Sequence, residues 1–460
     1  MKKNIFLFFI FFIAILVVVF LRKNENFEGY LPFLFAGFVF IFLIEKALLG
    51  NSLKFTLITL PSFFLLSYII LMSLPSIFWF FKMDTHIKYT YFLAIQSVLI
   101  TFPIGVGLAS RFFQYRSRII TNFLSSGLAK TRSDQQMFPF FVLMFIFSIL
   151  TIIIYICSAD YVPLFGSITR YGELDALTVR YSIYRVPDII RYSLALTLRM
   201  FLPFCLLYSY FMNYVYKGKW KYVFWIMLFL MLCASLLTFE RVYSFSLFIF
   251  LILAAYFKNY QSISKINIRL IVFVFTILIL AIFIGGIVSI MQYNIKFINF
   301  EKTIDVAKSF LFNRVLGASS YMAYISFEEF SDPTLFLYGK SFRLLSLFGT
   351  EFRSITPPSF IAELWLNFGW GGIIIGTIMI GFILEFLQLV FFRKKSIPFL
   401  SFYILLLLNG GWLIYGHVLG TMTVSVFLIT ISFLFLLLAL KKPKVLNSAL
   451  HLNKEVSVNH

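Results

Sequence analysis

The amino-acid sequence predicts an all-α polytopic integral membrane protein, organised as a single membrane domain over residues 1–460. Apolar residues make up 61% of the chain, charged residues only 13%, and the mean hydropathy is +0.94. Soluble globular domains carry about 25% charged residues, so this composition excludes a water-soluble enzyme. Apolar runs close to the roughly 20 residues that an α-helix needs to cross a bilayer recur along the whole sequence.

These runs predict about 12 transmembrane helices. The run 243–257 is short for a span, and the run 360–391 is long enough to be bent or to extend past the bilayer core. The first run follows Met1-Lys2-Lys3 and meets Arg22 without a small-residue cleavage site, so we interpret it as an uncleaved span. The predicted spans are 4–21, 31–48, 55–80, 89–109, 138–157, 191–213, 222–239, 243–257, 269–291, 360–391, 397–415 and 420–440.

The distribution of charge predicts the topology. With both termini in the cytoplasm, the cytoplasmic side collects 22 of the 39 Lys and Arg residues but only 4 of the 19 acidic residues. An excess of basic residues marks cytoplasmic loops, so this orientation is the expected one. The basic clusters lie at the ends of spans, including a cytoplasmic tail at 441–460. The net charge of +20 therefore predicts membrane anchoring and no nucleic-acid partner.

Two extracytoplasmic loops are large enough to take part in chemistry. The first spans 158–191 and the second 292–359. A shorter outer turn between the seventh and eighth spans carries Glu240 and Arg241 at membrane depth, where charge is costly and usually functional. We find no internal repeat and no separate soluble domain in the sequence.

Arginines in these outer segments are candidate ligands for a diphosphate. The planar guanidinium group donates two parallel hydrogen bonds to phosphoryl oxygens, which a lysine cannot do. The alternative is that each arginine pairs with a neighbouring Asp or Glu, or lies at the interface with its charge in water. The candidates are Arg180, Arg185, Arg191, Arg241, Arg314, Arg343 and Arg353.

A polar stripe marks the entry to the tenth span. Proline tolerates the first turn of a helix, so Thr356-Pro357-Pro358-Ser359 predicts a helix start capped by Thr356 or Ser359. Ser359, Glu363 and Asn367 follow one another at intervals of four and share one face of that helix. We expect the helix N-terminus to point outward and to favour an anion. The alternative for the stripe is a hydrogen-bonded seam between helices.

No motif predicts a cofactor or a metal ion. The sequence contains no P-loop, dinucleotide-binding fingerprint, HExxH or GxSxG motif. Its four histidines are scattered, at His86, His417, His451 and His460, so they do not predict a metal site. Three glycines after the polar stripe, Gly369, Gly372 and Gly376, predict close helix packing.

Several segments together resemble the bacterial O-antigen and oligosaccharide repeat-unit polymerases, the Wzy-like family. The resemblance rests mainly on Tyr338-Gly339-Lys340-Ser341-Phe342-Arg343, on the run from Thr356 to Leu364, and on Asn367-Phe368-Gly369-Trp370-Gly371-Gly372. It also covers Leu237-Thr238-Phe239-Glu240-Arg241 and Val162-Pro163-Leu164-Phe165. The predicted number of spans, the inner termini and the two large outer loops are similar to that family as well.

The resemblance implies a glycosyltransferase with a GT-C-like arrangement in the bacterial cytoplasmic membrane. Similar enzymes move a glycan from undecaprenyl diphosphate onto a sugar hydroxyl of a second lipid-linked repeat unit, and a chain-length regulator is a further expected partner. In this chain the arginines named above, with Ser359 and Asn367, would bind the diphosphate and substrate without a metal ion. Glu363 is the first candidate for the general base and Glu240 the second.

Two other functions remain open from the sequence. A polysaccharide ligase would use the same donor and the same arginines with a different acceptor. A flippase or secondary transporter for lipid-linked glycans would be expected to show repeated halves and charged or broken helices near mid-membrane.

Overall fold

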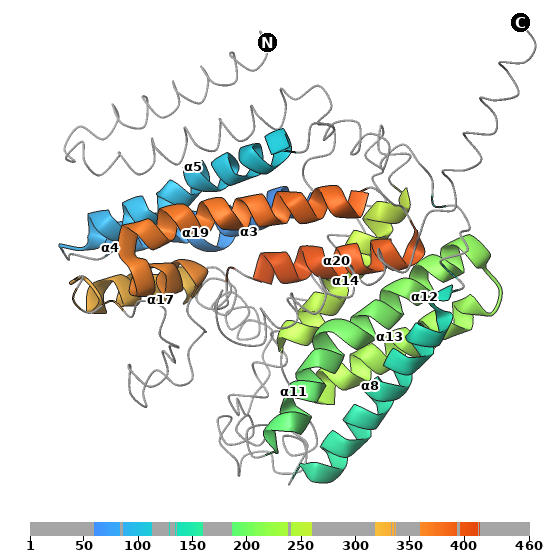
Figure 1. Ribbon diagram of the computed structural model, residues 1–460. Helices are drawn as coiled ribbons and strands as arrows, with labels where there is room; N and C mark the ends of the chain where they lie inside the picture. The colour runs from blue at the N-terminus through green and yellow to red at the C-terminus, as the bar shows by residue number, and fades with distance from the viewer. Residues whose placement is uncertain are drawn as a thin grey trace, which may run out of the picture.

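The computed structural model describes residues 59–82, 86–112, 128, 134, 136–159, 186–237, 241–259, 318–332, 334, 336, 359–392, 396–412 and 414. Within these residues all regular structure is helical (Figure 1). The predicted spans 4–21, 31–48, 269–291 and 420–440 lie outside them, as do the tail 441–460 and most of the two large loops.

Helices occupy every predicted span that falls within the described residues. Two of the spans contain a π-helical turn, labelled η, and one further helix, α17, lies inside the predicted loop 292–359. In chain order the elements are α3 (Leu60–Tyr68), η3 (Ile69–Ser73), α4 (Leu74–Lys82), α5 (Lys88–Phe112), α8 (Phe138–Ser158), α11 (Asp188–Leu196), η4 (Thr197–Phe201), α12 (Leu202–Tyr216), α13 (Trp220–Leu237), α14 (Arg241–Asn259), α17 (Ala318–Glu329), α19 (Phe360–Phe392) and α20 (Ile397–Trp412).

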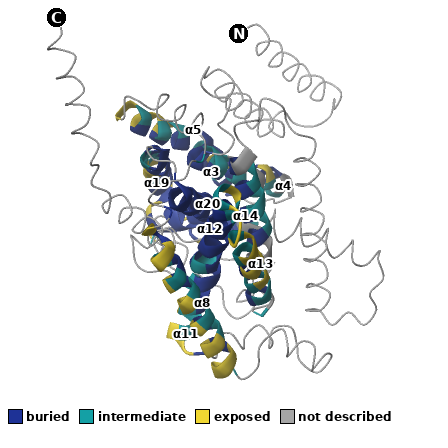
Figure 2. Ribbon diagram, turned by 90° about the vertical axis from the view of Figure 1, so that its right-hand side faces the viewer, coloured by how far each residue is buried: buried dark blue, intermediate teal, exposed yellow. Residues whose placement is uncertain are grey.

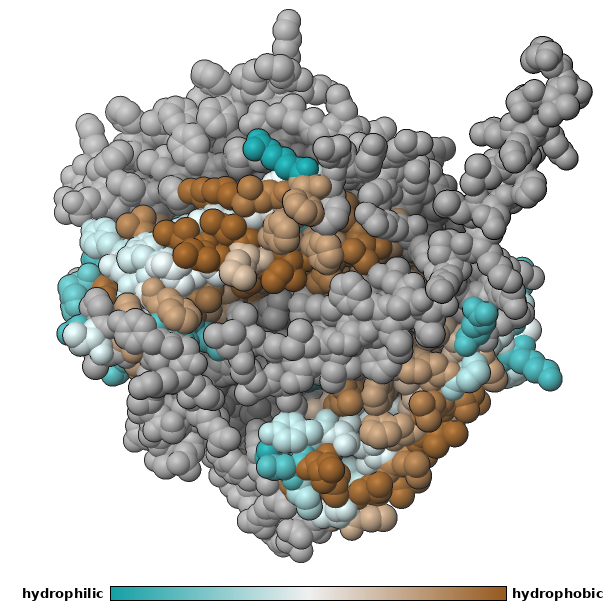
Figure 3. All heavy atoms as spheres, viewed as in Figure 1, coloured by the Kyte–Doolittle hydropathy of each residue, from teal (hydrophilic) through white to brown (hydrophobic). Residues whose placement is uncertain are grey.

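Four helical runs are long and apolar enough to cross a bilayer: Lys88–Phe112, Phe138–Ser158, Asp188–Tyr216 and Phe360–Phe392. Trp220–Ser235, Ser246–Phe257 and Ile397–Gly411 are apolar but shorter. Apolar side chains cover long stretches of α5, α19 and α8 on the face shown in Figure 3. The described chain is therefore that of an all-helical membrane protein, while the total of 12 spans stays a prediction.

The described helices form two groups joined by α20. The first group contains α3, η3, α4, α5, α17 and α19, and the second contains α8, α11, η4, α12, α13 and α14 (Figure 1). α20 contacts α3 and α19 in the first group and α12 and α14 in the second. It lies between them and is almost entirely buried (Figure 2).

In the first group, α5 and the second part of α19 run parallel with their backbones in close contact. Thr101 Oγ1 lies 2.6 Å from Thr377 Oγ1, and further along both helices Ser110 Oγ lies 3.3 Å from Glu385 Oε1. A Cβ added at Gly105 would lie 2.0 Å from the Ile378 carbonyl oxygen. Small residues permit this approach, as is usual in membrane interfaces.

Hydrogen bonds and aromatic rings place α3 and α4 antiparallel to α5. Tyr68 Oη donates to the Ile95 carbonyl oxygen over 2.7 Å, and Phe80, further along, packs its ring 5.2 Å from that of Phe92. The predicted topology requires α5 and α19 to run in one direction and the span 55–80 in the other. The observed directions agree with that alternation.

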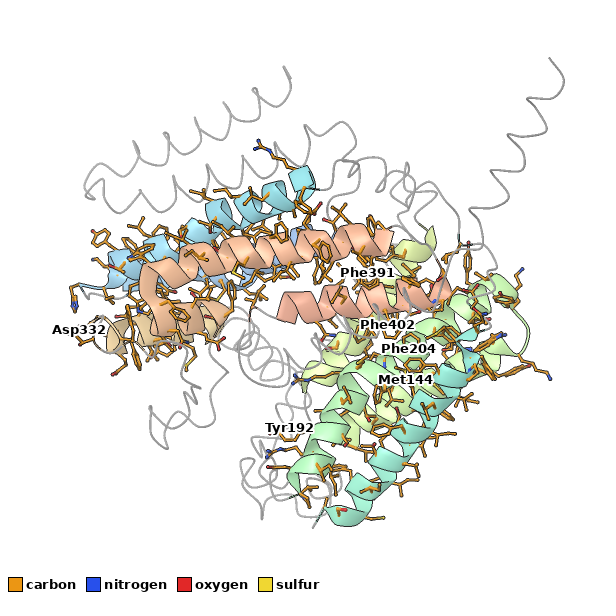
Figure 4. All side chains as sticks on the ribbon, viewed as in Figure 1. Met144, Tyr192, Phe204, Asp332, Phe391 and Phe402 are labelled. Carbon is orange, nitrogen blue, oxygen red and sulfur yellow. The ribbon has the colours of Figure 1, made fainter. Side chains whose placement is uncertain are left out.

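In the second group, aromatic rings fill the space between helices. The rings of Phe204 on α12 and Phe402 on α20 stack with 4.3 Å between centroids (Figure 4). Phe141 on α8 packs against Tyr208 on α12, and further along α8 Phe147 packs against Phe201 in η4. As the residue number increases along α8, the number of the partner residue in α12 and η4 decreases. These helices therefore run antiparallel.

Asp134 joins the start of α20 to the second group. Its side chain is buried, and Oδ1 accepts a hydrogen bond from the backbone amide of Ile397 over 3.2 Å. Tyr216 at the end of α12 donates to Oδ2 over 3.4 Å. The first backbone amides of a helix have no hydrogen-bond partner within the helix, and they lie at the positive end of its dipole. The Asp134 carboxylate accepts a hydrogen bond from one of these amides and places a negative charge at that end.

Candidate functional site

The polar stripe lies on a helical arm that folds back on its own helix. α19 contains a break at Gly369, where φ is 56° and ψ is −139°. A Cβ added at Gly372 would lie 2.4 Å from the Leu364 carbonyl oxygen, and one added at Gly376 would lie 2.6 Å from Leu364 Cδ2. In a straight helix, residues 364 and 376 would be about 18 Å apart. Residues 360–368 therefore turn back beside 370–392.

Of the two alternatives for the run 360–391, a bend or an extension past the bilayer core, the structure shows a bend, and it is a reversal. Glycine adopts a positive φ without the steric cost that a Cβ brings, so Gly369 can hold this turn. Gly372 and Gly376 confirm the predicted close packing, although their neighbour is the other arm of α19 and not a separate helix. Phe336 packs over the reversal, 2.7 Å from where a Cβ of Gly369 would lie.

Ser359 caps the first arm, as the sequence predicted for Thr356 or Ser359. Its hydroxyl oxygen accepts a hydrogen bond from the Ala362 backbone amide over 3.3 Å, the usual pattern of an N-cap serine. Asn367 donates through Nδ2 to the Glu363 carbonyl oxygen over 2.8 Å. Ser359, Glu363 and Asn367 are all buried, at 0%, 5% and 2% exposure. The three polar residues thus share one helical face.

The expected outward direction of this helix N-terminus is wrong. The ring of Phe360 packs 5.6 Å from that of Phe64, which stacks 4.9 Å from Phe102. The Phe102 carbonyl oxygen is in turn 2.3 Å from where a Cβ of Gly381 would lie. The start of the first arm is therefore level with the middle of the second arm. Sequence reasoning allowed for a bend in 360–391, but it took the direction of the N-terminus from the alternation of spans and so missed the reversal.

The exposed end of α19 is consequently the reversal itself. Phe368 and Trp370, on either side of Gly369, are 46% and 40% exposed. Asn367 lies closest to this tip, and Ser359 lies deepest, which inverts the predicted order of the stripe. The positive end of the helix dipole then points into the bundle.

α17 packs against the first arm and was not predicted. Trp365 stacks on Phe327 with ring centroids 4.3 Å apart, and its Nε1 donates to the Phe330 carbonyl oxygen over 3.1 Å. Tyr91 on α5 donates to the carbonyl oxygen of Ser320 over 2.9 Å. The predicted hydrophilic loop 292–359 thus contains a helix buried against α5 and α19. The sequence signal that could have predicted this helix was the apolar stretch 321–327, which contains no glycine.

After α17 the chain turns toward the tip of α19. The Thr334 backbone amide donates to Asp332 Oδ1 over 2.9 Å, and this bond lowers the pKa of the exposed Asp332 carboxyl below its usual value. The turn precedes Phe336, whose ring centroid lies 5.8 Å from that of Trp365. Trp365 also meets Trp370 at 6.1 Å. Aromatic rings therefore pack around the reversal.

Of the predicted arginines, Arg191 is described with its side chain. Its Nη2 lies 2.7 Å from Asp188 Oδ1 on α11, and its guanidinium lies 5.3 Å from the ring centre of Tyr192. This is the local pairing that the sequence left open as an alternative. Figures 1 and 2 show α11 and the first arm of α19 in separate parts of the bundle.

The other predicted charged residues are placed only in part. Arg241 is the first residue of α14, and its side chain lies outside the described residues. The remaining candidates also lie outside them: Glu240, Arg180, Arg185, Arg314, Arg343 and Arg353. Within the described part of the chain, no cluster of three or more His, Cys, Asp or Glu side chains could hold a metal ion.

Sequence reasoning also passed over Arg199. This residue lies within the predicted span 191–213, in the π-helical turn η4, and is half-buried. The available signal was a charged residue inside an apolar run, which by itself marks a candidate functional position in a membrane protein.

Comparison with known proteins bears on the segment that contains the reversal. Residues 358–445 match the family model described as O-antigen polysaccharide polymerase Wzy. This segment is Wzy-like. The match confirms the family resemblance and covers all of α19 and α20. No curated protein and no solved structure matches the chain. The polar stripe therefore belongs to the Wzy-like segment, whereas Arg191, Arg199 and Arg241 precede it.

Proposed function

We propose that this protein polymerises undecaprenyl-diphosphate-linked oligosaccharide repeat units into O-antigen, capsule or exopolysaccharide chains. The reaction would take place at the outer face of the cytoplasmic membrane, with both chain termini in the cytoplasm. The observation that carries the proposal is the Wzy match over residues 358–445. Its first residues form the reversed arm that buries Glu363. Twelve spans in a GT-C-like arrangement are part of the proposal.

The reaction is a glycosyl transfer between two lipid-linked substrates. A hydroxyl oxygen of the acceptor sugar attacks the anomeric carbon of the donor glycan, and the bond between that carbon and the diphosphate oxygen breaks. The hydroxyl proton passes to a carboxylate, and undecaprenyl diphosphate leaves with the bonding electron pair. Holding the two substrates in line supplies much of the acceleration, because the diphosphate is already a good leaving group.

Glu363 is the preferred general base, with Glu240 second. A carboxylate at membrane depth is costly, and residues of this kind usually serve a function. Glu363 is buried on the reversed arm. The side-chain amide of Asn367 donates a hydrogen bond to the backbone carbonyl oxygen of Glu363 and stabilises this turn of the helix. The glycine reversal holds the arm against α17 and the second arm of α19. Such packing gives a catalytic side chain a fixed position.

Positive charge for the departing diphosphate would come from arginine side chains. The outer-loop candidates Arg180, Arg185, Arg314, Arg343 and Arg353 can donate paired hydrogen bonds to phosphoryl oxygens, as can Arg191 and Arg241. The proposal uses no metal ion. A chain-length regulator is the expected protein partner.

The size distribution of surface polysaccharide tests the proposal. Cells that lack the gene would be compared on a gel with cells restored with wild type, Glu363→Gln, Arg241→Ala or Arg343→Ala. We expect the deletion to collapse the ladder to a single repeat unit, wild type to restore it, and the three variants to fail at equal protein level. Glu328→Gln, which changes an exposed acid on α17, is the matched control and should restore the ladder.

The alternatives give different gels. Loss of even the single-repeat form would indicate a ligase or a flippase, and an unchanged ladder would indicate a transporter of another substrate. A ladder that Glu363→Gln restores but Glu240→Gln does not would transfer the role of base to Glu240.

A further inference from the structure

Two aromatic side chains are exposed at the reversal of α19. Phe368 ends the first arm and Trp370 begins the second, and their exposed fractions are 46% and 40%. Every other residue of the first arm, from Phe360 to Asn367, is buried. Among the described residues nothing accepts a hydrogen bond from the indole N–H of Trp370. The tip of α19 therefore presents two aromatic surfaces and one hydrogen-bond donor to its surroundings.

A buried layer of aromatic rings holds Trp370 in place. Its ring centroid lies 6.1 Å from that of Trp365, with the two ring planes at 84°. Trp365 is itself fixed, because it stacks on Phe327 and donates from Nε1 to the Phe330 carbonyl oxygen. A ring held in this way loses little conformational entropy when it binds a ligand. A side chain that only anchors a helix in lipid needs no such fixed orientation.

A carboxylate lies beside the aromatic tip. Asp332 is exposed and follows Phe330, the residue that Trp365 binds, and Figure 4 shows it at the end of α17 beside the reversal. The Thr334 backbone amide donates to Asp332 Oδ1 and orients the carboxylate. Residues 318–332 contain acidic side chains and no basic one. Negative charge repels anionic lipid headgroups, whereas carboxylate oxygens accept hydrogen bonds from hydroxyl groups. The tip therefore favours a neutral ligand rich in hydroxyls.

The chemistry of the tip matches a sugar ring. The face of an aromatic ring is electron-rich and attracts the C–H groups on the face of a pyranose. The Trp370 indole N–H and the Asp332 carboxylate supply a donor and an acceptor for the hydroxyls at the edge of the sugar. On the predicted topology the basic run 393–395 keeps the other end of α19 in the cytoplasm. The tip then faces the compartment in which the proposed reaction would take place.

The aromatic tip lies on a different side of the first arm from the polar stripe. Trp365 follows Glu363 by two residues, which places it about 200° further around the helix. Phe368 follows Trp365 by three residues and therefore lies on the same side as Trp365. A sugar bound at the tip is thus not the sugar that reacts at Glu363. It belongs to a more distant part of the glycan.

We propose that Phe368 and Trp370 bind a sugar ring of the lipid-linked glycan, at a subsite apart from the reacting bond. Asp332 accepts hydrogen bonds from the hydroxyls of that sugar. The inference rests on the proposed function for the identity of the glycan as a repeat-unit oligosaccharide. The contact is the same before and during the reaction, so its loss should raise KM and leave kcat largely unchanged. The subsite adds specificity for the glycan.

A titration followed by saturation-transfer NMR tests the inference on the purified full-length protein in detergent. The probe is the oligosaccharide that mild acid releases from the lipid-linked repeat unit of the same cells. We expect Trp370→Leu, which removes the ring, to weaken binding at least about fivefold. Trp370→Phe and Asp332→Asn should weaken it less, because each keeps part of the contact. Trp225→Leu changes a tryptophan on α13 that is 57% exposed, and this control should bind as wild type.

Undecaprenyl monophosphate, which carries the lipid but no sugar, is the comparison probe. It should not displace the oligosaccharide, and displacement would assign the tip to lipid and overturn the inference. Wild-type binding by Trp370→Leu, equal losses in Trp370→Leu and Trp225→Leu, or no binding by wild type would also overturn it. Variants are compared only when they elute as one monodisperse peak. If Trp370→Leu does not fold, Phe368→Leu and Asp332→Asn replace it in the test.

Binding requires no polymerisation, so its outcome is separate from the ladder. If both proposals hold, cells with Trp370→Leu should still make a ladder, but of shorter chains. A ladder that depends on the gene, with oligosaccharide binding independent of Trp370, rejects this inference alone. Trp370-dependent binding in cells whose ladder does not depend on the gene rejects the polymerase and keeps the glycan subsite.

Discussion

The central pair of the first group, α5 and α19, packs by different means from the helices of the second group. α5 and α19 meet backbone to backbone through Gly105, Gly381 and the Thr101–Thr377 hydroxyl pair. α8, α12 and α20 meet through large rings such as those of Phe204 and Phe402. The first mode brings two backbones together and leaves room for a third layer, in which the reversed arm of α19 lies. The second mode keeps the backbones apart. Each group contains a π-helical turn within its described residues, η3 in the first and η4 in the second.

This comparison predicts that a larger side chain at the helix interface lowers the stability of the first group more than that of the second. Gly105→Val should separate α5 from α19, because a Cβ would lie 2.0 Å from a backbone oxygen that cannot move alone. We expect a loss of stability of about 4 kcal/mol or more, and little folded protein. Fluorescence-detected size-exclusion chromatography after heating would measure it. Gly107→Val, where a Cβ meets nothing within 4 Å, is the control and should behave as wild type.

Truncating a buried aromatic side chain should lower the stability of the second group. Phe204 is fully buried between α12 and α20, and Phe204→Ala would leave a cavity that costs about 3 kcal/mol. Unfolding by a denaturing detergent would measure the change. A cost below about 1 kcal/mol would show that the rings are not the main contact between these helices. Phe229→Ala, on the exposed face of α13, provides the comparison for loss of a ring alone.

Of the two neighbouring glycines Gly369 and Gly371, the reversal of α19 should depend on Gly369 alone. Gly369→Ala puts a Cβ on a residue with a φ of 56° and against the ring of Phe336, so it should cost about 2 kcal/mol. It should also shorten the polysaccharide ladder by displacing Glu363. In Gly371→Ala the added Cβ meets nothing within 4 Å, so the ladder should be normal. Equal ladders from the two variants would mean that the reversal does not position the site.

The smallest effect is expected from the hydroxyl pair between α5 and α19. Thr377→Val keeps the shape of the side chain and removes its hydrogen bond to Thr101. Hydrogen bonds between helices in membranes average about 0.6 kcal/mol, because the separated helices find other partners. Thermal unfolding in detergent should therefore shift little. A loss above about 2 kcal/mol would indicate that polar contacts, and not close backbone packing, hold the two helices together.

The sequence predicted the fold class, the apolar spans that the structure describes, and the relative directions of α3, α4, α5, α8, α12 and the second arm of α19. Hydropathy and charge suffice for this, because a bilayer admits only apolar helices that satisfy their own backbone groups, and basic residues fix which ends stay in the cytoplasm. The sequence also predicted that Ser359, Glu363 and Asn367 share a face, since this depends only on helical periodicity. The resemblance to the Wzy-like family came from local motifs and is confirmed over residues 358–445.

Tertiary structure alone decided the direction in which that face points. A straight helix and a reversed one have the same hydropathy, so only the contacts of Leu364 with Gly372 and Gly376 show that the first arm folds back. α17 was likewise hidden, because a short helix buried against other helices has no span-length signal. The sequence by itself determined which long runs are apolar and helical, because hydropathy and period are local, and contacts between distant segments determined how deep the polar residues lie within the bundle.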